Sequence, residues 1–503
     1  MTLTNPWNII LFFAISAVAV SYGWGMRGTT LGGEKGAMLP GALMGLMLAV
    51  FSGSDFLREH FYLLSAAGAL GLYFGGTMSY MQSIGLTSDK NPPEDFKRGM
   101  TGIFVKGCIW WGIFGSVVGM FLSFLSGRYY NSLRSVLLIF GLLPLFALAG
   151  SRLFDRPFDA QKGIHPRIYF SRNRPEGMGV LFGVLVELVI VMAISRDTVG
   201  LALMGGSALS GGVGWMLGQL LHIRGKWPNK RGWQFLGKHQ KRGWIDTLKI
   251  EECAYGACTA LGVCITFTLI ANCSFHYRAY YADLSLPSLT GTKEWALPAI
   301  FLALLGIDML RYVIRRRKTE QELRYMRSRG WMSDAELELA LQNPGKEPSR
   351  GWLLYEKIAE TATFPIYCVV PLLFLFLGSA EVAKLVSFYV MYYVMVEQQA
   401  FERFNRFKTI YLWRGLLLGI GGFMVFAQFH WGWTPGLLPT VLLYGAYYEA
   451  MTLVGNTAKR SPDRYGRKTI RESSLREAYG GLVTVHGYFL ICIAIVTAFA
   501  ARL

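Results

Sequence analysis

Long apolar runs recur along the chain and are separated by polar or glycine-rich connections. Each run covers about 18 to 25 residues with few charges, which is long enough for a helix to cross the hydrocarbon core of a bilayer. The runs are continuous rather than alternating, so they favour helices over strands. The pattern therefore predicts an all-α polytopic integral membrane protein with about 14 transmembrane helices. We expect these helices at residues 8–24, 37–52, 61–84, 101–125, 135–152, 177–194, 198–221, 250–273, 294–314, 353–377, 380–401, 410–429, 435–455 and 478–500.

The positive charges are distributed unevenly among the connections. The chain has 50 Lys and Arg residues, and most of them lie in the odd-numbered connections. Because loops rich in Lys and Arg stay on the cytoplasmic side, we expect the odd-numbered connections in the cytoplasm and both termini on the outer side. A bacterial inner membrane fits this orientation. The formal net charge of +18 then faces anionic lipid headgroups and requires no nucleic-acid partner.

Two long basic connections divide the chain into five parts. We expect a membrane half of seven spans, a basic Trp-rich cytoplasmic loop, spans eight and nine, a cytoplasmic helical hairpin and the five C-terminal spans, at 1–221, 222–249, 250–314, 315–352 and 353–503. A cut in the first of these loops leaves seven spans in each half. An odd number of spans makes the halves antiparallel, as in transporters built from inverted repeats.

A glycine-rich stretch joins the first two expected helices. Tyr22 to Ala49 reads YGWGMRGTTLGGEKGAMLPGALMGLMLA, and Arg27, Glu34 and Lys35 lie among its glycines. Glycine lets the backbone bend or approach a ligand closely, and the N-terminus of the following helix attracts negative charge. We interpret the stretch as a re-entrant or half-helix site at which Arg27, Glu34 and Lys35 bind substrate. The alternative is a tight turn at the membrane interface.

Glycines at four-residue spacing recur within the expected helices. This pattern lets two helices approach closely inside a membrane. It predicts a compact bundle with helix contacts at Gly41/Gly45, Gly71/Gly75, Gly115/Gly119, Gly179/Gly183, Gly214/Gly218 and Gly415/Gly419.

Ionisable residues inside spans are costly in lipid, so they normally face the protein interior or a water-filled cavity. Glu187 lies in the middle of its span, with no other charge near it in sequence. We predict that it couples an ion; the alternative is a protonated Glu that only stabilises the fold. Glu360, Glu449 and His486 lie about two turns inside their spans and predict a polar vestibule in which Glu360 and Glu449 bind substrate. The other ionisable residues within spans are Lys106, Glu251, Glu252, Asp308 and Glu397, with His222 at a boundary. The alternative to a vestibule is that these side chains snorkel to the interface or cap helix ends.

No metal site or cofactor is predicted. The His, Cys, Asp and Glu residues show no ligand spacing, and the chain has no HExxH, P-loop or GxSxG motif. Direct ATP hydrolysis is therefore not expected, and transport would draw on an ion gradient.

The tripeptide Arg-Gly-Trp occurs four times, always in the two long basic loops. Arg pairs with lipid phosphate, and Trp prefers the depth of the headgroups. We therefore expect the anionic headgroups of the bilayer to bind Arg231, Trp233, Arg242, Trp244, Arg329, Trp331, Arg350 and Trp352. Binding of an anionic cytoplasmic substrate or partner is the alternative.

The segment Phe401 to Glu449 contains FERFNRFKTIYLWR, FHWGW and LLYGAYYEA. It is loosely similar to the C-terminal part of membrane-bound O-acyltransferases, in which an Asn or His and a later intramembrane His lie in aromatic surroundings. The resemblance implies Asn405 and His430 as catalytic positions. His430 departs from the family pattern because it falls in a short outer loop rather than in a buried helix.

These patterns predict a transporter that moves a small polar, anionic or lipid-linked solute by alternating access, coupled to an ion. The alternative is a membrane-embedded transferase with a cytoplasmic donor that uses Asn405, His430 or His486. A non-catalytic scaffold is a second alternative, against which the buried charges count because they are costly without a function.

Overall fold

The structure is a computed structural model of the whole chain. It describes residues 3–27, 35–77, 81–88, 91–130, 132–157, 159, 162–168, 170, 177–226, 247–273, 284–285, 334–335, 369–377, 383, 386–387 and 390. The elements formed by these residues are helices, and no strand occurs among them.

The helical elements follow the predicted spans closely through the first half of the chain. They are α1 (Pro6–Arg27), η1 (Lys35–Ala37), α2 (Met38–Phe51), α3 (Asp55–Glu59), α4 (Phe61–Tyr73), η2 (Phe74–Thr77), α5 (Met81–Leu86), α6 (Pro93–Leu125), α7 (Leu133–Gly150), η3 (Ser151–Asp155), α8 (Met178–Ile194), α9 (Thr198–Lys226), α11 (Thr247–Cys273) and α17 (Val370–Leu377). Each of the first eight predicted spans contains a helix.

Five helices in the described part are long and apolar enough to cross a membrane. They cover Pro6–Gly25, Pro93–Leu125, Leu138–Asp155, Thr198–Arg224 and Ile250–Asn272. The apolar helices α2, α4 and α8 are shorter. An all-helical chain with long apolar helices is therefore confirmed for these residues and is compatible with a membrane protein.

The third predicted span differs from the expectation of one continuous helix. α4 ends at Tyr73, a 3₁₀ turn (η2) follows, and α5 begins at Met81. The turn contains Gly75 and Gly76 in succession, and glycine disfavours the helix interior because of its backbone freedom. Gly75 also faces the indole ring of Trp110 on α6, which leaves no room for a side chain there. Local sequence and packing thus interrupt this span together.

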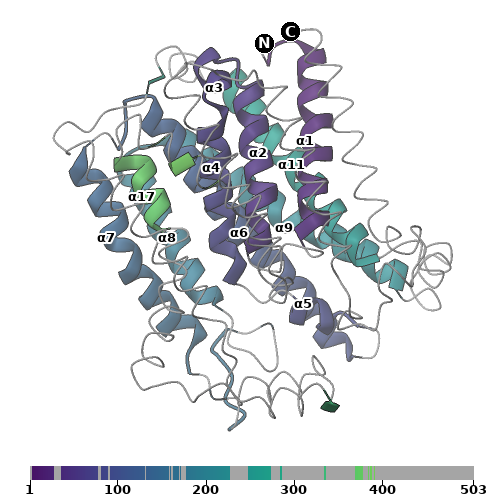
Figure 1. Cartoon of the computed structure of the whole chain (residues 1–503). Coiled ribbons are helices and arrows are strands. Elements are labelled where there is room, and N and C mark those ends of the chain that lie inside the picture. Colours follow the sequence, from purple (N-terminus) through teal and green to yellow (C-terminus); the bar gives the residue numbers. More distant parts are fainter. Residues whose placement is uncertain are drawn as a thin grey trace.

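α6 lies at the centre of the bundle. It contacts α4, α5, α8 and α9. Figure 1 shows α7, α8 and α17 on one flank and α1 on the other, with α2, α4 and α6 between them. α11 packs against α1 and α9. We name the two ends of the bundle after the short helices found there, the α3 end and the α5 end (Figure 1).

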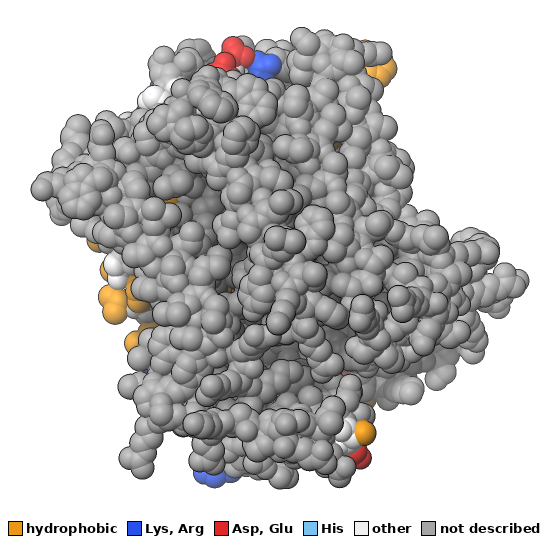
Figure 2. All heavy atoms as spheres, viewed as in Figure 1, with side chains coloured by type: hydrophobic (Ala, Val, Ile, Leu, Met, Phe, Trp, Pro, Cys, Tyr) orange, Lys and Arg blue, Asp and Glu red, His pale blue; other side chains and the backbone are white. Residues whose placement is uncertain are grey.

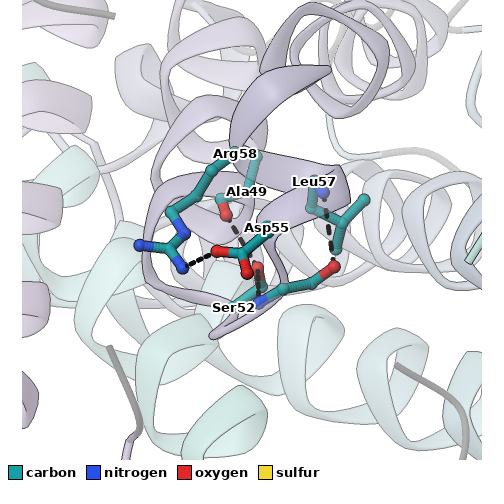
Figure 3. Close-up of polar contacts among 6 residues, drawn as sticks. Ala49, Ser52, Asp55, Leu57 and Arg58 are labelled. Carbon is teal, nitrogen blue, oxygen red and sulfur yellow. Dashed lines mark hydrogen bonds and ion pairs between the residues drawn. The ribbon is translucent and has the colours of Figure 1, made fainter. Parts of the chain in front are cut away.

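α2 and α4 form a short hairpin joined by a tight turn that contains α3. At the end of α2, Ser52 Oγ donates a hydrogen bond to the Ala49 carbonyl oxygen (2.7 Å). Arg58 pairs with Asp55 one turn earlier in α3. Figure 3 shows both contacts inside the turn. Ser52 and Asp55 thus form their contacts within the turn, while the two helices enter the apolar interior.

Glycines bring α2 and α4 into backbone contact. A Cβ atom on Gly45 would lie 2.7 Å from the Leu64 carbonyl carbon and 3.0 Å from Ser65 Cα, and one on Gly41 would lie 2.8 Å from the Gly68 carbonyl carbon. Real side chains do not reach such distances, so only glycine fits. This is the packing that the four-residue glycine spacing predicts.

The other described glycine pairs also lie at helix contacts. Gly71/Gly75 faces α6, Gly115/Gly119 faces α9, Gly179/Gly183 faces α7 and Gly214/Gly218 faces α11. The predicted contacts are therefore confirmed for every such pair that the structure describes; Gly415/Gly419 lies outside those residues.

Side chains from outside a helix bind free N–H groups at several helix starts, where the first turn has no internal acceptor. Ser54 Oγ accepts from the Leu57 N–H (3.3 Å) at the start of α3. At the start of α8, Asp155 of η3 accepts from the N–H groups of Gly179 (2.8 Å) and Val180 (3.2 Å). Asp155 thereby fixes where α8 begins relative to the end of α7.

Asp197 connects the ends of α6 and α9. Its carboxylate accepts hydrogen bonds from Ser123 Oγ (2.7 Å), Tyr130 Oη (2.9 Å) and the Gly200 N–H (2.8 Å). Desolvation by burial raises the pKa of Asp197, and these hydrogen bonds oppose the shift. The residue lies in the turn between α8 and α9, outside both helices.

Large apolar side chains are exposed along two flanks of the bundle. On α9 they recur at every third or fourth residue and so form one stripe. Figure 2 shows hydrophobic side chains along one flank and charged side chains toward the two ends. Soluble proteins rarely expose such surfaces, so these flanks fit contact with lipid. Their members include Leu138, Leu145, Leu148, Phe182, Ile190 and Ile194 on α7 and α8, and Leu209, Val213, Leu217, Leu220, Ile265 and Leu269 on α9 and α11.

The remaining predictions about architecture fall mostly outside the described residues. α17 lies in the tenth predicted span, and a few helical residues fall in the eleventh. Most of both long basic loops, with all eight Arg and Trp residues expected to bind lipid, are not among the described residues. The number of spans, the five-part division, the orientation and the antiparallel halves therefore stay predictions.

Candidate functional site

Four aromatic side chains from four helices meet inside the bundle. They are Trp24 of α1, Trp110 of α6, Trp215 of α9 and Tyr255 of α11, and all are buried. The ring centroids are 5.2 Å apart for Trp24 and Trp110, 5.7 Å for Trp110 and Trp215, 4.9 Å for Trp215 and Tyr255, and 4.6 Å for Tyr255 and Trp24. Each ring thus contacts two others, and we call this closed set the aromatic cluster.

The aromatic cluster is also tied to α4. Trp110 Nε1 donates a hydrogen bond to the Leu72 carbonyl oxygen (2.6 Å), in the last turn of α4. The same carbonyl also accepts from the Phe74 N–H at the end of α4. The cluster therefore lies beside the point at which the third span is interrupted.

A layer of buried polar side chains lies one helical turn from the aromatic cluster. Lys106 precedes Trp110 by four residues in α6, Glu251 precedes Tyr255 by four in α11, and Gln219 follows Trp215 by four in α9. Because α9 runs antiparallel to the other two helices, all three side chains lie toward the same end, the α5 end. We call Lys106, Gln219 and Glu251 the polar layer.

Glu251 is the acceptor at the centre of a hydrogen-bond chain. The amide nitrogen of Gln219 donates to its two carboxylate oxygens (3.1 and 3.0 Å), and the amide oxygen accepts from Thr87 Oγ1 (2.7 Å). We assign this amide orientation because a carboxylate can only accept. Trp215 Nε1 also donates to Glu251 (3.3 Å). These hydrogen bonds join the polar layer to the aromatic cluster through Trp215 and to the residues after α5 through Thr87.

Lys106 brings a positive charge into the same layer. Its side chain is fully buried, and Nζ donates a hydrogen bond to Ser83 Oγ of α5 (2.7 Å). Glu251 is 1% exposed. Two ionisable groups of opposite sign are therefore held in one buried layer, by hydroxyl and amide groups from neighbouring helices.

The aromatic cluster adjoins the glycine-rich stretch that is predicted from the sequence to be a substrate site. Trp24 belongs to that stretch, and α1 ends three residues later at Arg27. The next element, η1, begins at Lys35. The side chains of Arg27 and Lys35 and the whole of Glu34 lie outside the described residues. Their role in substrate binding stays a prediction, but the backbone carries Arg27 toward the depth of the polar layer.

The helices beside this site are too short to cross a bilayer alone. At 1.5 Å per residue, the 14 residues of α2 and the 13 of α4 span about 20 Å, against about 30 Å for the hydrocarbon core. Nearly all their residues are buried. Short buried helices that end near a polar site are typical of the discontinuous helices found in transporters.

Glu187 occupies a different part of the bundle. It is fully buried in α8, and neither of its carboxylate oxygens has a hydrogen-bond partner among the described residues. α8 contacts α6, α7 and α9. α1, with Arg27 at its end, packs instead against α2 and α11. The sequence therefore predicted a buried lone carboxyl correctly, and its part in ion coupling stays a prediction.

The other predicted site residues lie in the part of the chain that is not described. These are the substrate-binding candidates Glu360 and Glu449 and the catalytic candidates of the transferase alternative, Asn405, His430 and His486.

The aromatic cluster and Gln219 were missed by sequence reasoning. A signal was present, because three helices each carry a polar residue and an aromatic residue four positions apart, at Lys106/Trp110, Trp215/Gln219 and Glu251/Tyr255. Only contacts between the helices show that these pairs meet, and a single sequence does not contain them.

The described residues contain no group of three or more His, Cys, Asp or Glu side chains that could hold a metal ion. Comparisons of the chain with family models, with curated proteins and with solved structures found no match.

Proposed function

We propose that this protein is a membrane transporter that moves a small polar, anionic or lipid-linked solute by alternating access, coupled to an ion through Glu187. In this proposal about 14 spans cross a membrane such as the bacterial inner membrane, and the basic loops face the cytoplasm. The Arg-Gly-Trp repeats anchor those loops to anionic headgroups.

The observation that carries the proposal is the polar layer. Burial of Lys106 and Glu251 costs several kcal/mol per ion before pairing is counted. Inside a membrane, ionisable residues that face the bundle interior mark substrate or ion pathways. A protein that only served as a scaffold could fill this layer with apolar side chains at lower cost.

The arrangement suggests how the layer would bind a solute. Lys106 supplies donors for anionic or carbonyl groups, and Glu251 supplies acceptors for hydroxyl or amine groups. The aromatic cluster lies directly beyond the layer and closes it toward the α3 end with packed rings. Arg27, Glu34 and Lys35 would contact the solute from the glycine-rich stretch on the open side.

The interrupted third span offers a hinge for alternating access. η2 carries two glycines, and hinges commonly use small residues that absorb changes in backbone angles. Because Trp110 bonds to the last turn of α4, movement at η2 would pull on Trp110 and change its packing against Trp24 and Trp215. Opening of the cluster would then connect the layer to the opposite side.

The test is a flux assay in proteoliposomes with imposed proton and sodium gradients. Organic acids, sugars and amino acids are supplied to wild type, to Glu251→Gln and to Glu94→Gln, which makes the same chemical change at an exposed position. We expect gradient-driven uptake of one class in wild type and Glu94→Gln, and its loss in folded Glu251→Gln. Equal uptake by both variants would remove the polar layer from the transport path.

A further inference from the structure

Glu187 differs from the acids of the polar layer and of the helix caps because it accepts no hydrogen bond from the described residues. Asp155, Asp197 and Glu251 each accept two or more. Neither oxygen of Glu187 has such a partner, although its side chain is fully buried. An ionised carboxylate without partners is very costly in an apolar interior, whereas a neutral carboxylic acid is far less so.

α7 lacks one backbone hydrogen bond near the depth of Glu187, because it contains a proline there. Gly179 contacts Gly150 and Gly183 contacts Phe146 across the antiparallel pair α7 and α8. One turn further along α8, Glu187 therefore lies at the level of residues 142–143 of α7. Pro144 follows directly inside that helix. A proline cannot donate to the carbonyl four residues earlier and commonly bends a helix there.

Other titratable groups lie well away from Glu187 on the elements packed against α8. Asp155 of η3 binds the start of α8, about 10 to 12 Å from Glu187 along the axis, and Lys106 of α6 lies about as far toward that end. Asp197 lies ten residues further, beyond the other end of α8. Toward the α5 end there are also Cys108, Glu94, Asp95, Lys97 and Arg98 of α6, Arg152 of η3, and His222 and Arg224 of α9. No described side chain of α7, η2 or α17 is titratable.

These surroundings favour a proton over a metal cation as the bound ion. Sodium sites in transporters use unwound backbone carbonyls and several oxygen ligands. α8 is helical without interruption from Met178 to Ile194, so its carbonyl oxygens accept helical hydrogen bonds. Among the described residues Glu187 belongs to no group of three or more His, Cys, Asp or Glu side chains that could hold a metal ion. A proton requires only the carboxylate itself.

We propose that Glu187 is a proton-binding site and that the ion coupled to transport is H⁺ rather than Na⁺. Within the membrane interior the residue holds the proton as a neutral carboxylic acid. When water reaches Glu187 from the opposite side of the membrane, its O–H bond breaks, the proton passes to a water molecule and the carboxylate remains. The backbone hydrogen bond that Pro144 cannot make would let α7 move away from α8 at this depth and admit that water. The coupling role rests on the proposed transport function, but proton binding does not.

Two measurements on the full chain test this inference separately. Infrared difference spectroscopy after a pH change detects the carbonyl stretch of a carboxylic acid that gains or loses its proton. Asp197 and the exposed acids also contribute to this signal, so the band of Glu187 is the one that wild type shows and Glu187→Gln lacks. We expect this difference band, and we expect Glu187→Asp, which keeps a carboxyl group, to restore it at a shifted frequency. Glu94→Gln is the matched control and should keep the band that Glu187→Gln loses. Carboxylic-acid signals that are identical in wild type and in folded Glu187→Gln overturn the proposal.

The second measurement is uptake driven by a proton gradient or by a sodium gradient at equal pH on both sides. We expect uptake with the proton gradient alone and its loss in Glu187→Gln. Uptake driven by sodium alone, and lost in Glu187→Gln, would overturn the choice of ion. If the infrared band depends on Glu187 but no solute moves under either gradient, the proton site stands and the proposed transport function fails.

Discussion

Substitution of Gly45 by Ala tests the α2–α4 contact on which the interior of the bundle depends. The added methyl group would lie 2.7 Å from the Leu64 carbonyl carbon and 3.0 Å from Ser65 Cα. Because both atoms belong to the backbone, no rotamer change can relieve the overlap, and the two helices must separate. Overpacking of this kind costs about 1–3 kcal/mol. Ala is also a better helix former than Gly by about 1 kcal/mol, which partly hides that cost.

Gly205→Ala is the control that removes the helix-propensity effect. Gly205 lies inside α9, and a Cβ atom placed on it meets nothing within 4 Å. Both variants gain the same propensity, so the difference between them isolates the overpacking of about 1–3 kcal/mol. Thermal unfolding in detergent should give a lower midpoint for Gly45→Ala and an unchanged or higher one for Gly205→Ala. Equal midpoints would refute the backbone contact between α2 and α4.

Three further predictions concern helix caps, pH and lipid exposure. Asp155→Ala removes the acceptor at the start of α8 and should lower the free energy of unfolding by about 0.5–2 kcal/mol, measured by thermal or denaturant unfolding. Asp159→Ala is the control: it breaks a pair with a largely exposed Lys and should change that free energy less. Because the folded-state pKa of Asp197 is raised, its ionisation lowers stability as the pH rises from the ordinary Asp range through the raised value. In wild type the unfolding midpoint should therefore fall as the pH rises, and in Asp197→Asn this fall should be absent. Midpoints of the two proteins that fall in parallel would contradict the raised pKa of Asp197. A nitroxide label on Leu145→Cys, 61% exposed, should collide with oxygen dissolved in the bilayer rather than with a water-soluble nickel complex, while one on fully buried Leu181→Cys should meet neither.

Helix positions could be predicted from the sequence because the apolar runs are local properties. The helix boundaries were less accurate: α6 begins at Pro93, before the predicted span at 101–125, and Pro93 with the acidic Glu94 and Asp95 is the local signal for that N-terminus. The glycine pairs were also readable, since a spacing of four places both glycines on one face. The partner helix of each pair was not, because it depends on contacts distant in sequence.

The candidate site illustrates the same limit. Lys106 and Glu251 could be identified as ionisable residues within spans, but each alone fits a capping or interfacial role. Their common layer follows from the opposite directions of α6 and α9 and from the contacts of α11, which bring residues 145 positions apart to one depth. The aromatic cluster has the same origin, because its four rings come from four helices and no local pattern joins them.

Coupling between the polar layer and Glu187 requires an element that contacts both. α6 meets this condition: it carries Lys106, packs against α9 with Gln219, and contacts α8 on another side. Its contacts with α9 include close approaches of small residues, with Gly107 opposite Gly211 and Gly119 opposite Gly200, on either side of the contact between Trp110 and Trp215. A shift of α6 along this glycine seam would change the surroundings of the polar layer and of α8 together. Within our proposal, protonation of Glu187 and binding of solute would therefore act on one helix, and each would bias its position for the other.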